Sequence, residues 1–489
     1  MRLSRYIQKR EVAPGIIGMY NPFGHEVSFL PVQQHKAIEE HRFYDVAPQI
    51  LSDLSARKFI VEEGFENTIL DQYRPGEEGI REMWLILAQS CNMSCQYCVV
   101  EGNVEDPERR VYGGRRELRM IADHPEKAST DMMSPEIAEA AVHKFSRFLH
   151  ESRPLTPRVT LYGGEPLLNI QTIMHVVPLI RDISYPGQPR PNPVQVLVIT
   201  NGQIYEEELT TFFRKHSVSV SISLDGMKHH HDAVRVNHAG RGTFDQAVKS
   251  LKRYQAAGLR TGICTTIGTH NVNHLPEIAD YFAKEFNVPV EFEVPFDIPM
   301  NGGNKFYLPM KDAAAKALEA YTRLREKGLI EGLAIRRMIQ VARGEFHHRD
   351  CSAVGGQWVV APDGMIGPCH SLVGERTYFS GDVRKDDCDP FTQETFREWW
   401  KRMPINMPDC HGCSAIAICG GGCPYNALIK RGSIWEKDPQ QCEYMHELID
   451  WLIGDMWERY ITVQSKRGNY QDHFTEHELV GLSSRNFSF

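Results

Sequence analysis

Three cysteines, Cys91, Cys95 and Cys98, are the residues of this chain whose types and spacing most clearly indicate chemistry. They directly follow the apolar run Met83–Ala88, which is typical of a buried strand, so they share one short loop. Three thiolates on one loop can ligate three irons of a 4Fe–4S cluster and leave the fourth iron without a protein ligand. An iron with an open coordination site can bind a small molecule and pass an electron to it. The spacing therefore predicts a reactive iron–sulfur centre at this loop.

A zinc knuckle and a disulfide loop are the alternatives for these three cysteines. Zinc would require a fourth Cys or His at similar spacing, and the next residues, Val99–Gly102, offer neither. The motif therefore favours iron and sulfide over zinc.

A second set of cysteines occupies the C-terminal third of the chain. Cys351 is followed after twelve residues by Gly364 and after four more by Cys369. A C-x₂-C-x₅-C-x₃-C run then continues the set, and one more cysteine closes it; these five are Cys410, Cys413, Cys419, Cys423 and Cys442. Clustered cysteines in a large chain indicate metal ligation rather than a disulfide framework. A pair of structural zinc sites is the alternative, because Cys₄ zinc sites also use C-x₂-C.

Composition narrows the class of protein. A chain of 489 residues is expected to form two or three domains. A net charge of −8 gives no reason to expect nucleic acid or an anionic membrane as a partner. No segment approaches the roughly 20 apolar residues of a membrane span, and the N-terminus lacks the apolar core of a signal peptide. We therefore expect a cytoplasmic protein.

Apolar runs alternate with amphipathic stretches through residues 82–300, and the fold class predicted from this alternation is α/β. The expected strands are Met83–Ala88, Arg158–Tyr162, Gln195–Thr200, Val218–Leu224, Arg260–Ile267 and Pro289–Val294. The expected helices include Ser134–His150, Tyr205–Lys215, Phe244–Ala257 and Leu275–Glu285. Repeated βα units imply a parallel sheet with helices outside, and six of them predict a partial (β/α)₆ barrel over 81–304. Active sites of such folds lie at the C-terminal ends of the strands.

Four polar loops follow strands of this sheet and are therefore expected at one rim. They are the cysteine loop, Gly163–Pro166, Asn201–Gly202 and Asp225–Gly226. Their common position makes this rim the predicted active site.

The remaining segments are assigned from local patterns. In residues 1–80, short strands are expected at Gly15–Tyr20 and Glu26–Leu30 and a helix leading into a strand at 43–62. This pattern predicts a winged-helix-like module, which could bind a leader peptide or only pack on the next domain. A charged insertion at 101–130 is expected to be a surface loop or lid, and residues 305–345 are expected to form a helical bridge. A cysteine-rich domain follows at 346–445. A C-terminal helix with a polar tail occupies 446–489, although the amphipathic pattern of the helix starts at 443. The cysteine-rich domain has little hydrophobic periodicity, so metal ligation rather than an apolar core is expected to stabilise it.

The motifs of residues 82–300 resemble those of the radical S-adenosylmethionine (SAM) enzymes. The cysteine loop, completed by Tyr97, is similar to the family's C-x₃-C-x-aromatic-C motif, and Gly163-Gly164-Glu165-Pro166 is similar to its GGEP motif. The resemblance implies a 4Fe–4S cluster on the three cysteines, whose open iron chelates the amino and carboxylate groups of SAM. It also implies cleavage of SAM to a 5′-deoxyadenosyl radical, with the protein supplying orientation and a dry pocket.

The resemblance assigns SAM contacts to further residues. Glu165 would accept a hydrogen bond from the methionine ammonium, and the glycines Gly163 and Gly164 would let the backbone approach the ligand. Ser223 would contact the ribose or carboxylate and Arg235 the carboxylate, while Asn201 would face the pocket. For these last three, ordinary rim structure is the alternative. The run His229–His231 is interpreted as a solvated turn rather than a metal site.

Seven of the C-terminal cysteines and Gly364 resemble a SPASM domain, which implies two auxiliary 4Fe–4S clusters. One would use Cys410, Cys413, Cys419 and Cys442, and the other Cys351, Cys369 and Cys423. The fourth ligand of the second cluster stays open among Cys388, His347, His348 and no protein ligand, in which case a substrate thiolate could bind. Cys388 could equally be a buried bystander, as could Cys264.

Enzymes with this domain modify peptides and proteins, so the resemblance implies a maturase that joins two positions of a ribosomally made peptide through a thioether or carbon–carbon bond. Its partners would be a precursor peptide and a reductant such as flavodoxin or ferredoxin. Sulfatase maturases carry an aspartate base after the second SPASM cysteine, where this chain has His370, which could itself act as a base. That difference and the N-terminal module disfavour a formylglycine maturase. A small-molecule radical SAM dehydrogenase and an electron-transfer protein also stay open as functions.

Overall fold

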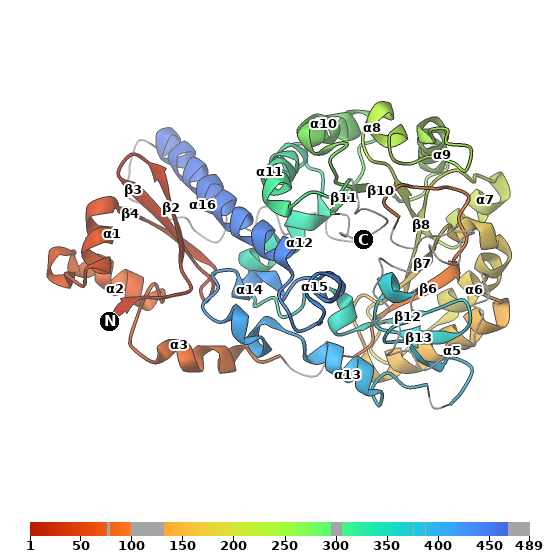
Figure 1. Ribbon diagram of the computed structural model, residues 1–489, viewed down its shortest axis with the longest axis horizontal. Coiled ribbons are helices and arrows are strands. Elements are labelled where there is room, and N and C mark those ends of the chain that lie inside the picture. Colours follow the sequence, from red (N-terminus) through yellow and green to blue (C-terminus); the bar gives the residue numbers. More distant parts are fainter. Residues whose placement is uncertain (76–78, 99–131, 295–305, 375, 387, 468–489) are drawn as a thin grey trace.

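A nine-stranded sheet forms the centre of the computed structural model, which describes residues 1–75, 79–98, 132–294, 306–374, 376–386 and 388–467. Six neighbouring strands run parallel: β6 (Glu82–Ala88), β7 (Arg158–Gly163), β8 (Gln195–Thr200), β9 (Ser219–Ser223), β10 (Thr261–Thr266) and β11 (Val290–Glu293). The six predicted strands are confirmed, with ends shifted by at most one residue. The protein is therefore a mixed α/β fold built on a parallel sheet (Figure 1).

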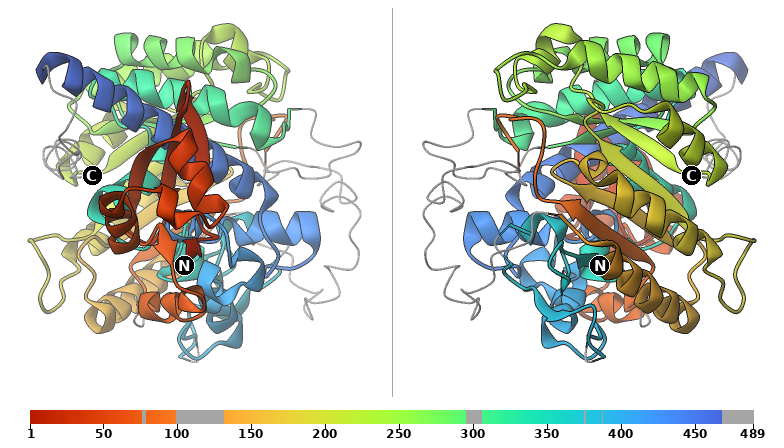
Figure 2. Two further views of the ribbon diagram at one scale, coloured as in Figure 1. Left: turned by 90° about the vertical axis from the view of Figure 1, so that its left-hand side faces the viewer. Right: turned by 90° about the vertical axis from the view of Figure 1, so that its right-hand side faces the viewer.

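Helices cover one face of this sheet, as the right-hand view of Figure 2 shows. They are α5 (Pro135–Ser152), α6 (Ile170–Asp182), α7 (Glu207–Lys215), α9 (Phe244–Ala256) and α10 (Leu275–Glu285). The start of α5 illustrates the local cause: Ser134 accepts a hydrogen bond from the Ile137 N–H, and Pro135 occupies the first turn. Apolar residues of α5 recur at helical spacing and are buried, so one stripe of the helix faces the sheet.

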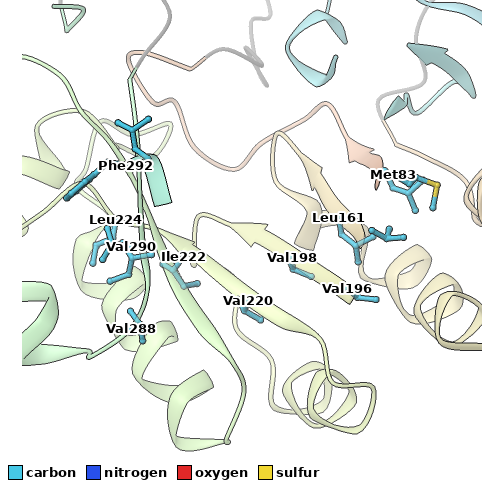
Figure 3. Packing of buried hydrophobic residues seen from close by; sticks show 14 of the residues in the cluster. Met83, Leu161, Val196, Val198, Val220, Ile222, Leu224, Val288, Val290 and Phe292 are labelled. Atoms are coloured by element: carbon cyan, nitrogen blue, oxygen red, sulfur yellow. The ribbon is translucent and has the colours of Figure 1, made fainter. Parts of the chain in front are cut away.

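Strand residues alternate between this helix-covered face and the opposite face, which we call the inner face. Figure 3 shows the side chains that point toward the helices: Met83, Leu161, Val196, Val198, Val220, Ile222, Leu224, Val288, Val290 and Phe292. Because the strand period is two, their neighbours point the other way. The register therefore places Trp84, Tyr162, Ser223, Cys264 and Glu293 on the inner face.

The cysteine-rich segment extends the sheet beyond β6, which the sequence did not predict. Strand β12 (Gln357–Val360) pairs in parallel with β6, and β13 (Met365–Gly367) and β14 (Ser380–Asp382) follow antiparallel. The expectation that this segment lacks an apolar core is wrong. Buried side chains gather here around β12 and pack against Ile86 of β6; they include Val354, Val359, Leu372, Trp399, Tyr425 and Leu428. Helices α13 (Glu394–Lys401), α14 (Ile416–Cys419) and α15 (Pro424–Arg431) complete the segment.

The N-terminal module contains a three-stranded antiparallel sheet of β2 (Gln8–Ala13), β3 (Ile16–Asn21) and β4 (Glu26–Pro31), in which β2 and β4 are the edge strands. Its other elements are α1 (Val32–Glu39), α2 (Pro48–Ala56), α3 (Phe65–Thr68) and the short pair β1 (Arg2–Leu3) and β5 (Ile60–Val61). The strands predicted around 15–31 and the helix leading into a strand at 43–62 are present.

A long helix, α16 (Pro439–Arg467), runs from the cysteine-rich segment along the N-terminal sheet (Figures 1 and 2). It starts four residues before the predicted amphipathic pattern at 443. Two helices of the expected bridge, α11 (Met310–Glu326) and α12 (Gly332–Arg343), lie between the parallel strands and this helix. The insertion 101–130 and the polar tail after 467 lie outside the described residues. None of the helices in the described part is long and apolar enough to cross a membrane.

Candidate active site

The loop that follows β6 carries Cys91, Cys95 and Cys98 and is fixed to a neighbouring segment by its backbone. The Ser94 N–H donates to the Val236 carbonyl at 2.8 Å, and the Gln96 N–H donates to Val234 at 3.0 Å. Burial, the Glu165 charge and the other two thiols raise the pKa of Cys91 to about 12. The three thiols therefore lie close enough to influence each other's ionisation, as ligands of one cluster must.

Two glycines after β7 allow a second loop to lie directly against the cysteine loop. A Cβ on Gly163 would lie 2.1 Å from the Ala88 carbonyl oxygen, and one on Gly164 would lie 2.3 Å from that of Ser90. The Gly164 N–H also donates to Ala88 at 2.7 Å. The sequence predicted that these glycines let the backbone approach the ligand, which stays a prediction; the close approach in the structure is to the end of β6 and the start of the cysteine loop.

Glu165 of the same loop is fully buried beneath the rim. Its carboxylate accepts hydrogen bonds from the Leu167 N–H at 3.0 Å, the Thr200 hydroxyl at 2.7 Å and the Asn201 N–H at 2.8 Å. Burial nevertheless raises the pKa of Glu165 to about 7. A buried carboxylate in this state gains from a nearby cation, which fits the predicted contact with a methionine ammonium.

Asn201, at the end of β8, joins this group. Its side-chain amide donates to the side-chain oxygen Oδ1 of Asn92 at 2.8 Å and to the Cys91 sulfur at 3.6 Å. The structure thus places Asn201 at the cysteine loop.

Asp225, just after β9, is the centre of a buried polar network that sequence reasoning named only as a turn residue. Its carboxylate accepts hydrogen bonds from the Tyr97 hydroxyl, from Arg235 Nε at 2.9 Å and from the Thr266 N–H at 3.0 Å. His270 Nε2 lies 3.7 Å away. Burial alone would raise the pKa of Asp225, but Arg235 and His270 together hold it well below its usual range. The carboxylate is therefore ionised and anchors residues from several loops.

The predicted SAM contacts at the far side of the rim have structural partners of their own. Arg235 is buried, and its guanidinium lies 5.3 Å from the centre of the Tyr97 ring. Ser223 is half-buried on the inner face, in register with Cys264. The interpretation of His229–His231 as a solvated turn is wrong for two of the three. They form the short helix α8 (Lys228–Asp232), in which His230 and His231 are buried.

The second set of cysteines forms two groups. Burial, then Cys442, Asp350 and the thiols of Cys413 and Cys410 raise the pKa of Cys419 well above its usual value. Burial, then Asp438 and the thiols of Cys369 and Cys351 do the same for Cys423. The two groups have the same members as the ligand sets that the SPASM resemblance implies, and their role as cluster ligands stays a prediction.

Within the part of the chain that the structure describes, no three His, Cys, Asp or Glu side chains lie close enough together to hold one metal ion. In a 4Fe–4S cluster each thiolate binds a different iron, so the ligands lie further apart than around one zinc ion.

The candidates for a further ligand differ in their surroundings. Cys388 is fully buried in the main apolar core with Val383 and Phe396, which favours its interpretation as a bystander. His347 Nε2 lies 3.8 Å from the Asp350 carboxylate, next to Cys351. His348 stacks on Phe346, with ring centres 4.9 Å apart.

His370, next to Cys369, points to the inner face of the sheet. Its ring stacks on Trp84 with centres 4.1 Å apart, and Tyr162 meets it edge-on at 5.5 Å. Burial lowers the pKa of His370 to about 4, so the ring is a neutral and weak base near pH 7. Sequence reasoning named neither aromatic partner; their alternation with the core residues of β6 and β7 was the available signal.

Comparisons with known proteins agree with this geometry. Residues 85–282 match the model of the Radical SAM superfamily. The radical SAM cyclopropyl synthase TigE of Paramaledivibacter caminithermalis is 23% identical, over 83% of this chain and 82% of its own length. A cysteine-type anaerobic sulfatase-maturating enzyme of Clostridium novyi is 22% identical, over 69% of this chain and 86% of its own length.

Two solved structures share the fold. The structure of anSMEcpe with bound AdoMet has a TM-score of 0.60 and 18% identity, covering 78% of this chain and 99% of that one. Streptococcus suis SuiB bound to precursor peptide SuiA has a TM-score of 0.52 and 13% identity, covering 90% and 99%.

Residues 85–282 are therefore a radical SAM domain, and the chain is similar to radical SAM enzymes that include peptide and sulfatase maturases. Proteins of this superfamily bind SAM and a 4Fe–4S cluster. The three thiols of the cysteine loop fit that cluster, and the Glu165 and Asn201 groups beside them fit a bound amino acid cation.

Proposed function

We propose that this protein is a peptide maturase that installs a crosslink, either a thioether or a carbon–carbon bond, in a ribosomally made precursor peptide. The observation that carries the proposal is the presence, in one chain, of the cysteine-loop site and an N-terminal module with an open sheet edge. The similarity to TigE and to the fold of SuiB supports it.

The open edge is strand β2, which pairs with β3 on one side only. A groove of about 460 Å³ lies between β2 and α1; its lining residues are Lys9, Arg10, Glu11, Ile17, Val32, His35, Lys36, Glu39 and Glu40. An edge strand offers unpaired N–H and C=O groups to an extended peptide, and a groove beside it can take the alternate side chains. We infer that a leader segment binds here as a fourth strand.

The chemistry would occur at the rim of the parallel sheet. When bound there, SAM and its cluster supply a 5′-deoxyadenosyl radical that takes a hydrogen atom from the peptide. Glu165, Asn201 and Arg235 would orient SAM, and Asp225 holds the cysteine loop by accepting a hydrogen bond from the Tyr97 hydroxyl. The two C-terminal thiol groups would hold auxiliary clusters that accept an electron, and a flavodoxin or ferredoxin would supply the reducing equivalent.

The proposal is tested by incubating the reconstituted, reduced enzyme anaerobically with SAM and candidate precursor peptides encoded beside its gene. We expect 5′-deoxyadenosine together with a peptide that has lost two hydrogens. A peptide with a formylglycine residue instead would contradict the crosslinking proposal.

Proline substitutions test the leader-binding edge. Successive N–H groups of a strand point to opposite sides, so one of Lys9→Pro and Arg10→Pro removes a donor to β3 and the other removes only a donor at the free edge. We expect the variant that removes only the free-edge donor to keep the fold and to lose leader affinity about tenfold or more, since it blocks strand addition. Lys9→Ala and Arg10→Ala control for the side chains. Unchanged affinity in both proline variants would exclude this edge.

A sulfatase-type formylglycine maturase is the second candidate, favoured by the similarity to the Clostridium novyi enzyme. Its base would be His370. The stacking of this ring on Trp84 and its low pKa of about 4 make it a poor proton acceptor near neutral pH, which disfavours this candidate.

A further inference from the structure

Two glutamates lie on the inner face of β11, close to the radical-forming rim. Val290 and Phe292 of this strand point into the apolar core, so Glu291 and Glu293 point to the opposite face (Figure 3). The register pairs Glu293 with Thr266 of β10. Crosslinking needs a proton acceptor, and these carboxylates lie on the face where the peptide must react.

The two glutamates differ in their partners. Glu291 forms an ion pair with Arg336 at 3.0 Å. Glu293 is exposed on the inner face, lies near the Cys264 thiol, which acts to lower its pKa, and takes part in no ion pair among the described residues. Besides burial, its charge and those of Cys98 and Cys264 all raise the pKa of the Tyr162 hydroxyl, so these groups lie near one another.

The charged groups around Glu293 set its basicity. Removal from bulk water and the charge of Glu291 raise its pKa, while Arg336, Cys264 and Arg235 act in the opposite direction; the net result is a raised pKa. Although the side chain is exposed on the inner face, the surrounding protein still replaces much of its water.

Three other acid–base groups near this face differ from Glu293 in their surroundings. Asp225 is tied to Arg235 and Tyr97, and Glu165 accepts three hydrogen bonds. The His370 ring stacks on Trp84. The Glu293 side chain, by contrast, is exposed.

We propose that Glu293 is a catalytic residue that accepts the proton released when the peptide crosslink forms. The inference rests on the proposed function. Joining two positions of a peptide removes two hydrogens: one leaves as a hydrogen atom to the 5′-deoxyadenosyl radical. The second leaves as an electron, taken by an oxidised 4Fe–4S cluster, and a proton, taken by the Glu293 carboxylate as the new bond forms.

Glu293→Gln tests this assignment, with Glu277→Gln on the exposed outer side of α10 as the matched control. We expect the first variant to form 5′-deoxyadenosine while crosslinked peptide falls by about 100-fold or more, the usual contribution of a general base. Glu293→Asp keeps the acid group and should recover part of the crosslinking. The control should match the natural protein.

The pH dependence gives a second readout. Crosslinking by the natural protein should rise with pH as Glu293 loses its proton and then level off, whereas Glu293→Gln should lack this rise. A pH-difference infrared spectrum of the protein without peptide should show one carboxylic acid band that the variant lacks.

The results of these experiments distinguish a failure of the Glu293 assignment from a failure of the proposed function. An unchanged ratio of crosslink to 5′-deoxyadenosine in Glu293→Gln, or an unchanged pH profile, would overturn the role of Glu293. If the natural protein cleaves SAM and never crosslinks a precursor peptide, the proposed function fails, and the infrared band still reports whether Glu293 holds a proton.

Discussion

At the scale of single residues, the site depends on buried charges that are fully partnered. Asp225 shares its carboxylate among Tyr97, Arg235 and Thr266, so it connects the cysteine loop to β10 and to the segment after α8. A buried ion pair adds little by itself, but removal of one partner leaves the other charge unpaired. Because Tyr97 lies between Cys95 and Cys98 in the sequence, its hydrogen bond to Asp225 connects this network to the cysteine loop.

Asp225→Asn should therefore destabilise the protein and loosen the cysteine loop. We expect a loss of about 3–5 kcal/mol of unfolding free energy, because the buried Arg235 loses its counter-ion. Asp245→Asn is the control, since Asp245 pairs with Lys228 on the surface and should cost under about 1 kcal/mol.

The measurement is chemical denaturation of both variants, with the iron content of the reconstituted protein as the second readout. Equal stability and equal iron content in the two variants would show that Asp225 does not anchor the loop.

At the scale of elements, the contact between β3 and α16 holds the N-terminal sheet on the rest of the chain. A Cβ on Gly18 would lie 2.4 Å from Ile453 Cγ2, so the helix approaches this strand as closely as a glycine allows. Gln8 and Arg10 of β2 add hydrogen bonds to carbonyls of α16 at 2.7 and 2.8 Å, and Phe29 packs on Trp457 with ring centres 5.0 Å apart.

Gly18→Val should push α16 away from the sheet. We expect a cost of about 1–3 kcal/mol for the overpacked contact, and faster proteolytic cleavage between the N-terminal module and β6. Gly24→Ala in the same module is the control, because its Cβ would meet the Glu26 side chain and the Arg57 carbonyl at ordinary distances of 3.4 to 3.7 Å. If Gly18→Val is cleaved no faster than Gly24→Ala, the contact with α16 does not hold the module.

At the scale of the whole molecule, one sheet joins the radical SAM domain to the cysteine-rich segment. Trp358 of β12 is fully buried, faces Met83 of β6 in the register and meets Phe148 of α5 edge-on at 5.2 Å. Glu82 of β6 also accepts a hydrogen bond from Ser352, next to Cys351, at 2.7 Å. The two parts therefore fold against a shared core.

Trp358→Ala should weaken both parts together, by about 3–5 kcal/mol. Alkylation of the protein without iron, read by mass spectrometry, should show faster labelling of Cys351 and Cys369 in this variant. The control is Trp435→Ala, since Trp435 is 37% exposed. Labelling of these thiols at the natural rate would show that the two parts do not depend on the shared strand pairing.

The predictable part of the fold was the part with strong local signals. Each central strand is an apolar run between polar turns, and each is followed by an amphipathic stretch, so β6 to β11 were found nearly residue by residue. Strands β12 to β14 have three or four residues each, and β12 joins them to β6, a strand far earlier in the chain, so no local pattern reveals them. The burial of His230 and His231 was missed for a similar reason, since neighbouring elements rather than their own spacing cover them.

The same distinction applies to the site. The grouping of the C-terminal thiols was expected from the resemblance to a SPASM domain and not from spacing, because Cys423 lies near the distant Cys351 and Cys369. The partners of Asp225 and Glu293 come from several different strands and loops, so only the folded chain brings them together. Glu165 and Asn201 were found because each follows a strand at the same rim.

The position of Cys442 in the first turn of α16 has a consequence for how the two ends of the chain communicate. Helix α16 carries this thiol near its N-terminal end. Further along, the same helix accepts hydrogen bonds from Gln8 and Arg10 of strand β2. Suppose that iron binding at the thiols around Cys442 and leader binding at β2 both favour the same position of α16. Each must then strengthen the other by an equal factor, because such coupling is reciprocal. We therefore expect the protein without iron to bind the leader peptide with lower affinity.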